Sequence, residues 1–327
     1  MIGITHLIAF TAGLLLLYYG AGWLVKGASN LARSFGLTPM VIGLTVVAFG
    51  TSAPELVVSL VSAAKSKSMI ALGNVVGSNI CNIALVLGLT AVFQPVSTQR
   101  TVITRDIPLM LGISAYLLLL SFNSVIGRIE GATLVAGIIA YTWFNYKVAV
   151  WVNRPLPVSG TADQSLPPAQ GTAGKTWFQC LLVIGGTASV VIGADLLVDA
   201  AVSIMNALGV NEKFVGLTVV AFGTSVPELA TSVVAAMKRE MEISLGNLVG
   251  SNVFNLLSVV GATVLVRPIT IDGGFIGSGL VVDYLVMMGV SALPILLMKQ
   301  DLTITRRNGL TLLMCYASYV CFLILKS

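Results

Sequence analysis

The sequence predicts an all-α membrane protein in which ten transmembrane helices form two inverted five-helix repeats. Three observations lead to this fold class: an apolar composition, apolar stretches that recur along the whole chain, and a long segment that occurs twice. Of the 327 residues, 56% are hydrophobic and 9% are charged, and the mean hydropathy is +0.96. Soluble domains carry about 25% charged residues, so the composition excludes a soluble protein.

The apolar stretches are long enough for helices that cross the roughly 30 Å hydrocarbon core of a bilayer. A membrane β-barrel would instead show segments of about ten residues with alternating polarity. We therefore predict ten helical spans, and we expect the long first, second and sixth of them to tilt or break within the membrane. The predicted spans are 3–29, 37–65, 71–94, 102–122, 128–151, 176–208, 213–238, 243–267, 275–299 and 306–325.

The Lys and Arg residues of the loops set the expected orientation of the spans. With the N-terminus outside, the inner side receives 12 of the 18 basic residues and the outer side receives six. We therefore expect a multi-pass protein of the cell inner (plasma) membrane with both termini outside. The cytoplasmic loops account for the net charge of +5, so this charge does not indicate a nucleic-acid partner.

Two blocks of the first half recur in the second half at a constant offset of 173 residues. Residues 43–61 match residues 216–234 at 15 of 19 positions, and residues 72–88 match residues 245–261 at 10 of 17. A fixed offset marks a duplicated unit. Because five spans precede the midpoint, an odd number of crossings inverts the second copy relative to the first, as in many secondary transporters.

The duplication divides the chain into a first five-helix repeat, residues 1–152, and a second, inverted repeat, residues 176–327. A weaker echo, RIEG at 128–131 and RRNG at 306–309, opens the fifth span of each repeat at an offset of 178. Residues 153–175 are rich in Pro, Gly, Ser and Thr, which predicts a flexible cytoplasmic linker. We expect all activity to reside in the membrane part, because this linker is too short for a folded sensor domain.

Each copy places a glutamate in the middle of an apolar segment, directly after a proline: Glu55 after Pro54, and Glu228 after Pro227. A proline leaves the carbonyl four residues earlier without its helical partner, and in a bilayer this carbonyl needs another one. A carboxylate at this depth indicates a functional site. Hydroxyl residues three and four positions earlier are expected on the face of each carboxylate. They are Thr51 and Ser52 in the first copy, and Thr224 and Ser225 in the second.

The second block of each copy adds a polar stripe to an otherwise apolar helix, because its amide and hydroxyl residues lie four positions apart. The stripe consists of Asn74, Ser78 and Asn82 in the first copy and of Asn247, Ser251 and Asn255 in the second. The pairs Gly73/Gly77 and Gly246/Gly250 have the spacing that lets another helix approach closely. We therefore expect each stripe to pack against a Pro-Glu segment.

These groups offer carboxylate, hydroxyl, amide and backbone oxygen atoms to a cation. Calcium prefers about six to eight oxygen ligands in flexible geometry, whereas zinc and copper favour Cys or His. Two carboxylates carry a charge of minus two, which matches one calcium or two sodium ions and makes competition between these ions a natural mechanism. A purely structural role, in which the polar groups only join helices, is the alternative for a single copy. The presence of two complete copies disfavours it.

Other reactive residues stay outside this candidate site. The four cysteines, Cys81, Cys180, Cys315 and Cys321, lie in apolar spans without metal-like spacing and are expected to be packing residues. Three aspartates, Asp195, Asp199 and Asp283, are ambiguous and are left out.

The motifs GTSAPEL with GSNICN, and GTSVPEL with GSNVFN, resemble the two alpha-repeats of the cation/calcium exchanger superfamily, in particular its bacterial sodium/calcium antiporters. The resemblance covers essentially the whole chain and implies ion sites between the second, third, seventh and eighth helices. By motif position, Glu55 and Glu228 would be the central ligands of calcium and sodium. The other implied metal ligands are the hydroxyls of Thr51, Ser52, Thr224, Ser225, Ser78 and Ser251, the backbone carbonyls of Ala48 and Ala221, and the amides of Asn82 and Asn255.

The chain departs from the family at one point. Members often carry an aspartate at one of the positions of Asn82 and Asn255, whereas here both are amides. The fixed negative charge at the centre of the implied site is therefore no more than two.

These observations favour a secondary antiporter that exchanges sodium for calcium by alternating access, with ions bound at the midplane between the repeats. A proton/calcium antiporter of the same architecture is the alternative, because a membrane glutamate can also carry protons. The many hydroxyl and amide oxygens favour sodium, which needs a full coordination shell. A cation channel or a scaffold is a third hypothesis, which the inverted repeat and the paired sites disfavour. We expect calcium, sodium and the lipid bilayer as partners, with no enzymatic activity, cofactor or obligatory protein partner.

Overall fold

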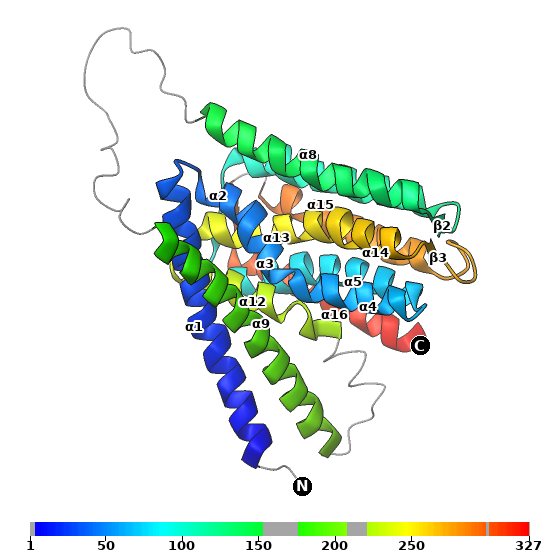
Figure 1. Ribbon diagram of the computed structural model, residues 1–327, viewed down its shortest axis with the longest axis horizontal. Coiled ribbons are helices and arrows are strands. Elements are labelled where there is room, and N and C mark those ends of the chain that lie inside the picture. The colour runs from blue at the N-terminus through cyan, green and yellow to red at the C-terminus, as the bar shows by residue number, and fades with distance from the viewer. Residues whose placement is uncertain (1–3, 153–175, 208–220, 299–300, 327) are drawn as a thin grey trace.

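The computed structural model describes residues 4–152, 176–207, 221–298 and 301–326. These residues form an all-helical bundle with four two-residue strands (Figure 1), so the predicted all-α class is confirmed. The predicted linker, 153–175, lies outside the described residues.

The helices of the first half include three π-helical segments, η1 to η3. In chain order they are α1 (Ile4–Ser34), α2 (Pro39–Ile42), η1 (Gly43–Val47), α3 (Ala48–Thr51), α4 (Ala53–Ala64), α5 (Ser68–Ile80), η2 (Cys81–Leu87), α6 (Gly88–Phe93), η3 (Val102–Asp106), α7 (Ile107–Ser121) and α8 (Arg128–Val152).

The described helices of the second half follow the same order with one π-helical segment, η6. They are α9 (Thr176–Ala207), α11 (Ala221–Gly223), α12 (Val226–Met237), α13 (Met241–Phe254), η6 (Asn255–Val259), α14 (Val260–Val266), α15 (Leu280–Leu297) and α16 (Arg306–Lys326).

Seven helical segments of the described chain are long and apolar enough to cross a bilayer, and an eighth span consists of two helices joined at a bend. These eight coincide with predicted spans. The predicted fifth span, 128–151, is helix α8, which does not belong to this strongly apolar set. The predicted seventh span, 213–238, is described from residue 221 onward, where it contains α11 and α12.

The three spans that were expected to tilt or break behave differently from one another. The second bends by 45° between Thr51 and Ala53. Helices α1 and α9 are continuous over 31 and 32 residues. At about 1.5 Å per residue they exceed the thickness of the hydrocarbon core. They lie side by side and are inclined to the neighbouring helices (Figure 1), as expected for long spans that tilt in a bilayer.

The bend in the second span lies at Ser52, whose backbone leaves the helical range with φ −85° and ψ 10°. Pro54 follows in the first turn of α4, where the missing N–H group costs no helical hydrogen bond. Ser225 has nearly the same backbone angles, φ −90° and ψ 3°, and Pro227 lies in the first turn of α12. Both Pro-Glu segments therefore start new helices.

The short strands join the two halves of the chain. Strand β1 (Val96–Ser97) pairs antiparallel with β4 (Thr303–Ile304), and β2 (Val125–Ile126) pairs antiparallel with β3 (Ile269–Thr270). Strand β3 follows β1 at the offset of 173, and β4 follows β2 at the offset of 178. The two strand pairs are thus equivalent under the sequence duplication.

Two close helix contacts obey the same relation. A Cβ atom at Gly309 on α16 would lie 2.7 Å from the carbonyl oxygen of Gly88 on α6. A Cβ atom at Gly261 on α14 would lie 3.1 Å from the carbonyl oxygen of Gly131 on α8. Gly88 and Gly261 are 173 residues apart, and Gly131 and Gly309 are 178 apart. Glycine at these positions lets the helix backbones touch.

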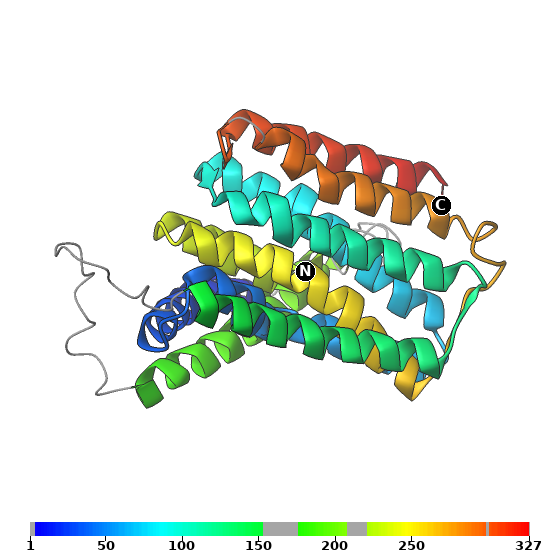
Figure 2. The same cartoon turned by 90° about the horizontal axis from the view of Figure 1, so that it is seen from above.

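Helices of the two halves interleave in the bundle. Figure 2 shows α13 between α7 and α8, and segments α2, η1 and α3 also pack against α13. The main hydrophobic core contains fully buried residues of both halves, among them Leu72, Leu87, Leu248 and Leu256. Neither half therefore completes its core alone.

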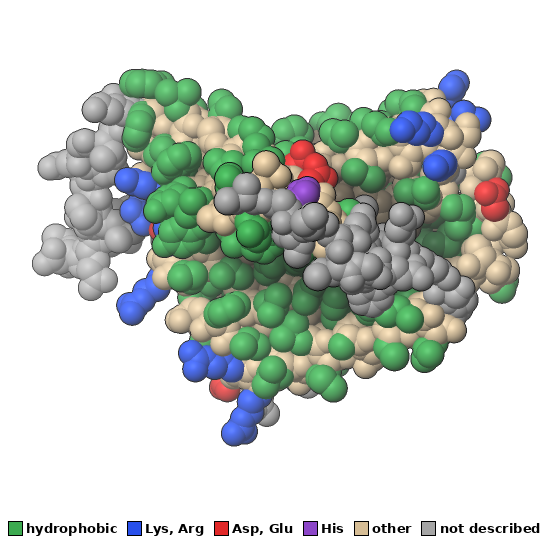
Figure 3. Space-filling model, turned by 90° about the horizontal axis from the view of Figure 1, so that it is seen from below, with side chains coloured by type: hydrophobic (Ala, Val, Ile, Leu, Met, Phe, Trp, Pro, Cys, Tyr) green, Lys and Arg blue, Asp and Glu red, His purple; other side chains and the backbone are tan. Residues whose placement is uncertain are grey.

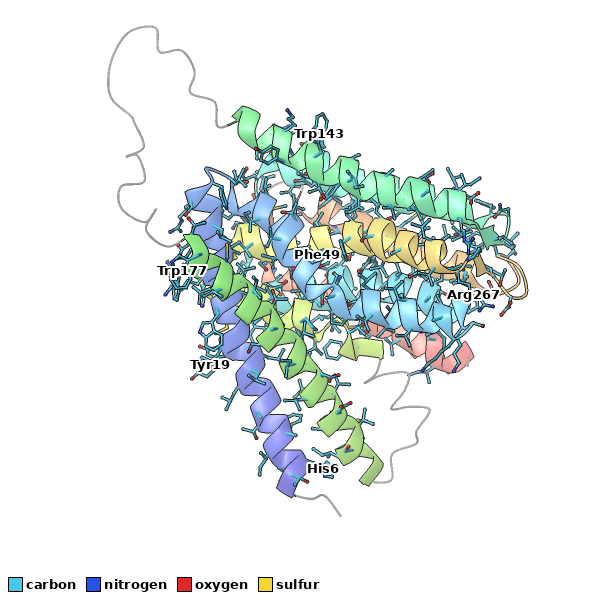
Figure 4. All side chains as sticks on the ribbon, in the orientation of Figure 1. His6, Tyr19, Phe49, Trp143, Trp177 and Arg267 are labelled. Atoms are coloured by element: carbon cyan, nitrogen blue, oxygen red, sulfur yellow. The ribbon has the colours of Figure 1, made fainter. Side chains whose placement is uncertain are left out.

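The surface has the character of a membrane protein. Hydrophobic side chains cover much of the described surface in Figure 3, whereas Lys and Arg gather towards its two ends. Trp143, Trp177 and Tyr19 point away from the bundle (Figure 4) and are 61%, 63% and 56% exposed. Such amphipathic aromatic residues are typical of side chains that face lipid near the membrane surface.

Candidate functional site

Two glutamates from different halves lie close together inside the helix bundle. Glu55 is in the first turn of α4 and Glu228 in the first turn of α12, and both are 0% exposed. Their carboxyl groups are near enough for their charges to interact. Each follows a helix break, at Ser52 or Ser225, and so lies at a helix N-terminus, where the backbone dipoles favour negative charge.

Each carboxylate is met by hydroxyl groups of the opposite half. Ser52 Oγ donates a hydrogen bond of 2.9 Å to Glu228 Oε1, and Thr51 lies near the same carboxylate. Thr224 in turn lies near the carboxylate of Glu55. The spacing placed Ser52 on the face of Glu55, whereas its hydroxyl donates to the glutamate of the other half. The helix breaks at this residue, and the spacing rule holds only within a continuous helix.

The polar stripes contact the Pro-Glu segments, as predicted. Asn74 Nδ2 on α5 donates to Ser59 Oγ on α4 over 3.0 Å. Asn247 Nδ2 on α13 donates to Ser232 Oγ on α12 over 3.1 Å, which is the equivalent contact at an offset of 173. Thr51 Oγ1 donates to Asn247 Oδ1 over 2.9 Å. This bond joins the helix break of the first half to the polar stripe of the second half.

The serines in the middle of the two stripes also reach the glutamates. Ser78 lies beside the carboxylate of Glu55, and Ser251 beside that of Glu228. Ser251 Oγ is also 3.3 Å from Thr51 Oγ1. Both serines are buried. The structure thus brings two carboxylates and several hydroxyl oxygens into one buried group.

The last residues of the stripes, Asn82 and Asn255, lie where α5 and α13 pass into the π-helical segments η2 and η6. Both are 0% exposed. Asn82 Nδ2 donates to Asn252 Oδ1 over 3.0 Å, and Asn255 Nδ2 donates to Asn79 Oδ1 over 3.2 Å. The amide nitrogens are therefore engaged across the two halves.

Within the described part of the chain, many buried oxygen atoms of the candidate site residues have no hydrogen-bond partner. They are Oε1 and Oε2 of Glu55, Oε2 of Glu228, Oγ of Ser78 and Ser225, Oγ1 of Thr224, and Oδ1 of Asn82 and Asn255. Buried polar atoms without partners cost free energy, and an unpaired buried carboxylate costs most. A cation bound by these oxygens would remove that cost.

No basic side chain of the described residues compensates the two glutamates. The ion pairs found there are Arg33 with Glu240 and Arg105 with Asp106. No group of three or more His, Cys, Asp or Glu side chains suited to a metal occurs in the same residues. The donor set is thus two carboxylates surrounded by neutral oxygens, which suits calcium or sodium better than zinc or copper.

The two predicted carbonyl ligands have less support. The carbonyl oxygen of Ala48 accepts a hydrogen bond from Ser52 N at 3.0 Å and lies 3.4 Å from Thr51 Oγ1, whose single hydrogen is directed to Asn247 Oδ1. Ala221 is the first residue of α11, and the residues before it lie outside the described chain. Coordination by either carbonyl stays a prediction.

The glycine pairs of the stripes differ between the halves. Gly246 and Gly250 pack against the backbone of α2 and η1, as expected for a close helix contact. A Cβ atom at Gly73 or Gly77 would meet no described atom within 4 Å, so the expected close approach is found for one pair only.

Sequence reasoning missed several residues that hold the site together. Asn252 and Asn79 accept hydrogen bonds from the side chains of Asn82 and Asn255. Ser59 and Ser232 accept hydrogen bonds from Asn74 and Asn247. Their identity in both copies at the offset of 173 was the available signal. Cys81, expected to be a packing residue, also lies beside the site, because its thiol interacts with Ser225 and Tyr316.

The three ambiguous aspartates are placed by the structure. Asp283 on α15 accepts a hydrogen bond of 3.0 Å from the hydroxyl of Tyr319 on α16. Asp195 and Asp199 are exposed on α9.

Comparison with known proteins places this chain in a family. A family model described as sodium/calcium exchanger protein matches residues 5–147 and 178–325. The chain is 36% identical to the putative antiporter CaxA of Alkalimonas amylolytica, over 94% of this chain and 95% of that protein. The chain belongs to the sodium/calcium exchanger family. This confirms the family resemblance read from the two motif pairs, and the family is one of membrane transporters rather than enzymes.

Other relatives agree with this assignment. The sodium/calcium exchanger MaX1 of Methanosarcina acetivorans is 30% identical, over 94% of this chain and 95% of that protein. The inner membrane protein YrbG of Escherichia coli is 37% identical over 80% of this chain and 79% of that protein. A solved structure of the sodium-calcium exchanger NCX_Mj superposes with a TM-score of 0.81 at 31% identity, covering 99% of this chain and 100% of that one.

Proposed function

We propose that this family member exchanges sodium for calcium across the membrane, and that both ions use the group of oxygens around Glu55 and Glu228. The observation that carries the proposal is the pair of fully buried carboxylates with no basic partner among the described residues. A charge of minus two balances one calcium ion or two sodium ions. Binding of one kind of ion therefore excludes the other, which couples their movements.

The surroundings of the glutamates favour sodium over protons as the coupling ion. Unpartnered hydroxyl and amide oxygens, those of Ser78, Thr224, Asn82 and Asn255, accompany the carboxylates. Sodium needs such neutral oxygens to replace its water shell, whereas a proton needs only the carboxylate. A proton/calcium antiporter of the same fold remains the alternative that the transport experiment below separates.

The proposed architecture is two inverted five-helix repeats that meet at the ion site near the membrane midplane. Equivalent contacts of the two halves support it: the strand pairs, the glycine contacts and the stripe hydrogen bonds all repeat at the offsets of the sequence duplication. A contact of residue i with j that recurs between their counterparts is the mark of a two-fold relation. Alternating access would follow from movement of one part of the bundle against the other.

In the proposed orientation the protein lies in the cell inner membrane with both termini outside. Residues 153–175 then lie in the cytoplasm. The excess of Lys and Arg on the linker side supports it. A cysteine introduced at position 163 of a cysteine-free variant should react with a membrane-impermeant reagent only after the membrane is opened. A cysteine at position 327 should react in intact cells. The reverse pattern would refute the orientation.

Calcium flux into proteoliposomes tests the proposed exchange. A sodium gradient, high inside, should drive calcium uptake, and sodium-free vesicles with a proton gradient of the same size should show none. Calcium uptake that follows the proton gradient and ignores sodium would establish the alternative. The Glu130→Gln variant serves as the matched control, because Glu130 is a carboxylate at the start of α8 and is not part of the oxygen group.

A further inference from the structure

Four hydrogen bonds join four asparagines at the meeting point of the two halves, which we call the asparagine clasp: Asn79, Asn82, Asn252 and Asn255. Asn79 and Asn252 are 1% exposed, and Asn82 and Asn255 are 0% exposed. The clasp joins α5 and η2 to α13 and η6. Its members are related by the offset of 173, so every hydrogen bond of the clasp has a counterpart.

The backbone fixes how the inner two amides are oriented. Asn79 Nδ2 lies 3.4 Å from the carbonyl oxygen of Asn252, and Asn252 Nδ2 lies 3.2 Å from the carbonyl oxygen of Asn79. A backbone carbonyl can only accept a hydrogen bond. The opposite orientation of either side chain would place two acceptor oxygens against each other. The amide nitrogens therefore face the carbonyls, and the Oδ1 atoms of both residues face the other way.

The inner amides in turn orient the outer two. Asn252 Oδ1 accepts from Asn82 Nδ2 at 3.0 Å, and Asn79 Oδ1 accepts from Asn255 Nδ2 at 3.2 Å. Each outer amide has only one oxygen, so its Oδ1 is turned away from the clasp. These two Oδ1 atoms are buried and have no partner in the described chain. Segment η2, which carries Asn82, packs against the helix of Glu228, and η6, which carries Asn255, packs against the helix of Glu55.

We infer that Asn79 and Asn252 are positioning residues, which select the oxygen rather than the nitrogen of Asn82 and Asn255 as the atom presented to the ion. The inference rests on the proposed function, because it assigns a role in cation binding. Without the clasp an amide could turn its NH₂ group, which carries partial positive charge, towards the cation. Residues that orient a metal ligand through a hydrogen bond typically change metal affinity by about 10- to 100-fold when they are replaced.

The clasp also explains why the outer positions hold amides in this chain. A carboxylate at position 82 or 255 has no hydrogen to donate to Asn252 Oδ1 or Asn79 Oδ1. It would instead place a negative charge against an acceptor oxygen. The clasp therefore keeps the charge of the site at the minus two of the glutamates.

Calcium binding to the purified protein in detergent tests the inference with a cycle of variants. Asn252→Leu should raise the calcium dissociation constant of the folded protein at least about tenfold, as should Asn82→Ala. In the Asn82→Ala background, Asn252→Leu should add little, because it acts through Asn82. In the Asn255→Ala background it should keep most of its effect. Conversely, Asn79→Leu should add little in the Asn255→Ala background and should keep most of its effect in the Asn82→Ala background. Independent, additive effects in all four combinations would overturn the inference.

Two further measurements separate positioning from mere stability and from failure of the proposed function. Asn145→Leu is the control: Asn145 is 1% exposed on α8 and binds the carbonyl oxygen of Tyr141 in its own helix. It should lower the melting temperature without changing the dissociation constant. In ion-free protein, the side-chain NH₂ signal of Asn82 should be protected from hydrogen exchange and lose this protection in Asn252→Leu.

The outcomes are distinguishable. An unprotected Asn82 NH₂ group in the unaltered protein would overturn the clasp, whatever the protein binds. A protected NH₂ group in a protein that binds neither calcium nor sodium would overturn the proposed function, and the positioning role with it.

Discussion

Glu55→Gln and Glu228→Gln are each expected to abolish sodium-dependent calcium transport. Both carboxylates are fully buried and close to one another, and they supply all the fixed negative charge of the proposed site. At an effective dielectric constant of about 20, one unit charge at about 4 Å contributes ~4 kcal/mol per unit of ion charge. Loss of one carboxylate should therefore reduce calcium affinity by at least about a thousandfold. Radioactive calcium uptake and equilibrium binding measure the two effects.

The two variants should fail alike and should still fold. A neutral amide is easier to bury than a charge, so insertion and the melting temperature without ions should be retained or improved. Glu130→Gln should transport normally. A Glu228→Gln protein that exchanges calcium at normal rates would confine the site to one half of the chain and contradict the shared site.

Gly250→Ala is expected to destabilise the protein and to disturb ion binding. A Cβ atom at Gly250 would lie 2.6 Å from the carbonyl oxygen and 2.7 Å from the Cα atom of Leu44 in η1. Backbone atoms cannot rotate away, so α13 and η1 must separate, at a cost of ~1–3 kcal/mol or more. The adjoining contact between α3 and α13 holds Thr51 beside Asn247 and Ser251. The melting temperature and calcium affinity should therefore fall together.

Gly289→Ala is the matched control substitution, and it is not expected to lower the stability of the protein. Gly289 lies inside α15, and a Cβ atom there would meet no described atom within 4 Å. Alanine favours a helix interior over glycine by about 1 kcal/mol, so this variant should be equally or more stable. If Gly250→Ala were as stable as Gly289→Ala, the close contact between α13 and η1 would not exist.

The sequence was sufficient to predict the class of the fold and several hydroxyl residues that lie near the glutamates. Composition identified the membrane helices, and the duplication singled out Glu55 and Glu228, because two copies of a costly buried group indicate function. The helix break beside Pro54 was also expected. These features depend on local chemistry and on repetition, both of which a single sequence displays.

The partners of these residues could not be predicted in the same way. Ser52 donates to Glu228 rather than to Glu55, which depends on how the two halves pack. Asn79 and Asn252 bind across the halves, so no spacing within one helix reveals them. The π-helical segments arise inside apolar stretches whose periodicity suits an α-helix equally well. Tertiary contacts decided each of these features.

Calcium binding to the purified protein at increasing sodium concentration tests the central claim, a single site that the two ions share, most directly. Equilibrium dialysis in sodium-free buffer should give one calcium ion per chain, and sodium should displace it completely, while the same concentration of a bulky organic cation leaves it bound. Calcium that stays bound at saturating sodium would show that the two ions occupy separate sites, and it would contradict the shared use of Glu55 and Glu228.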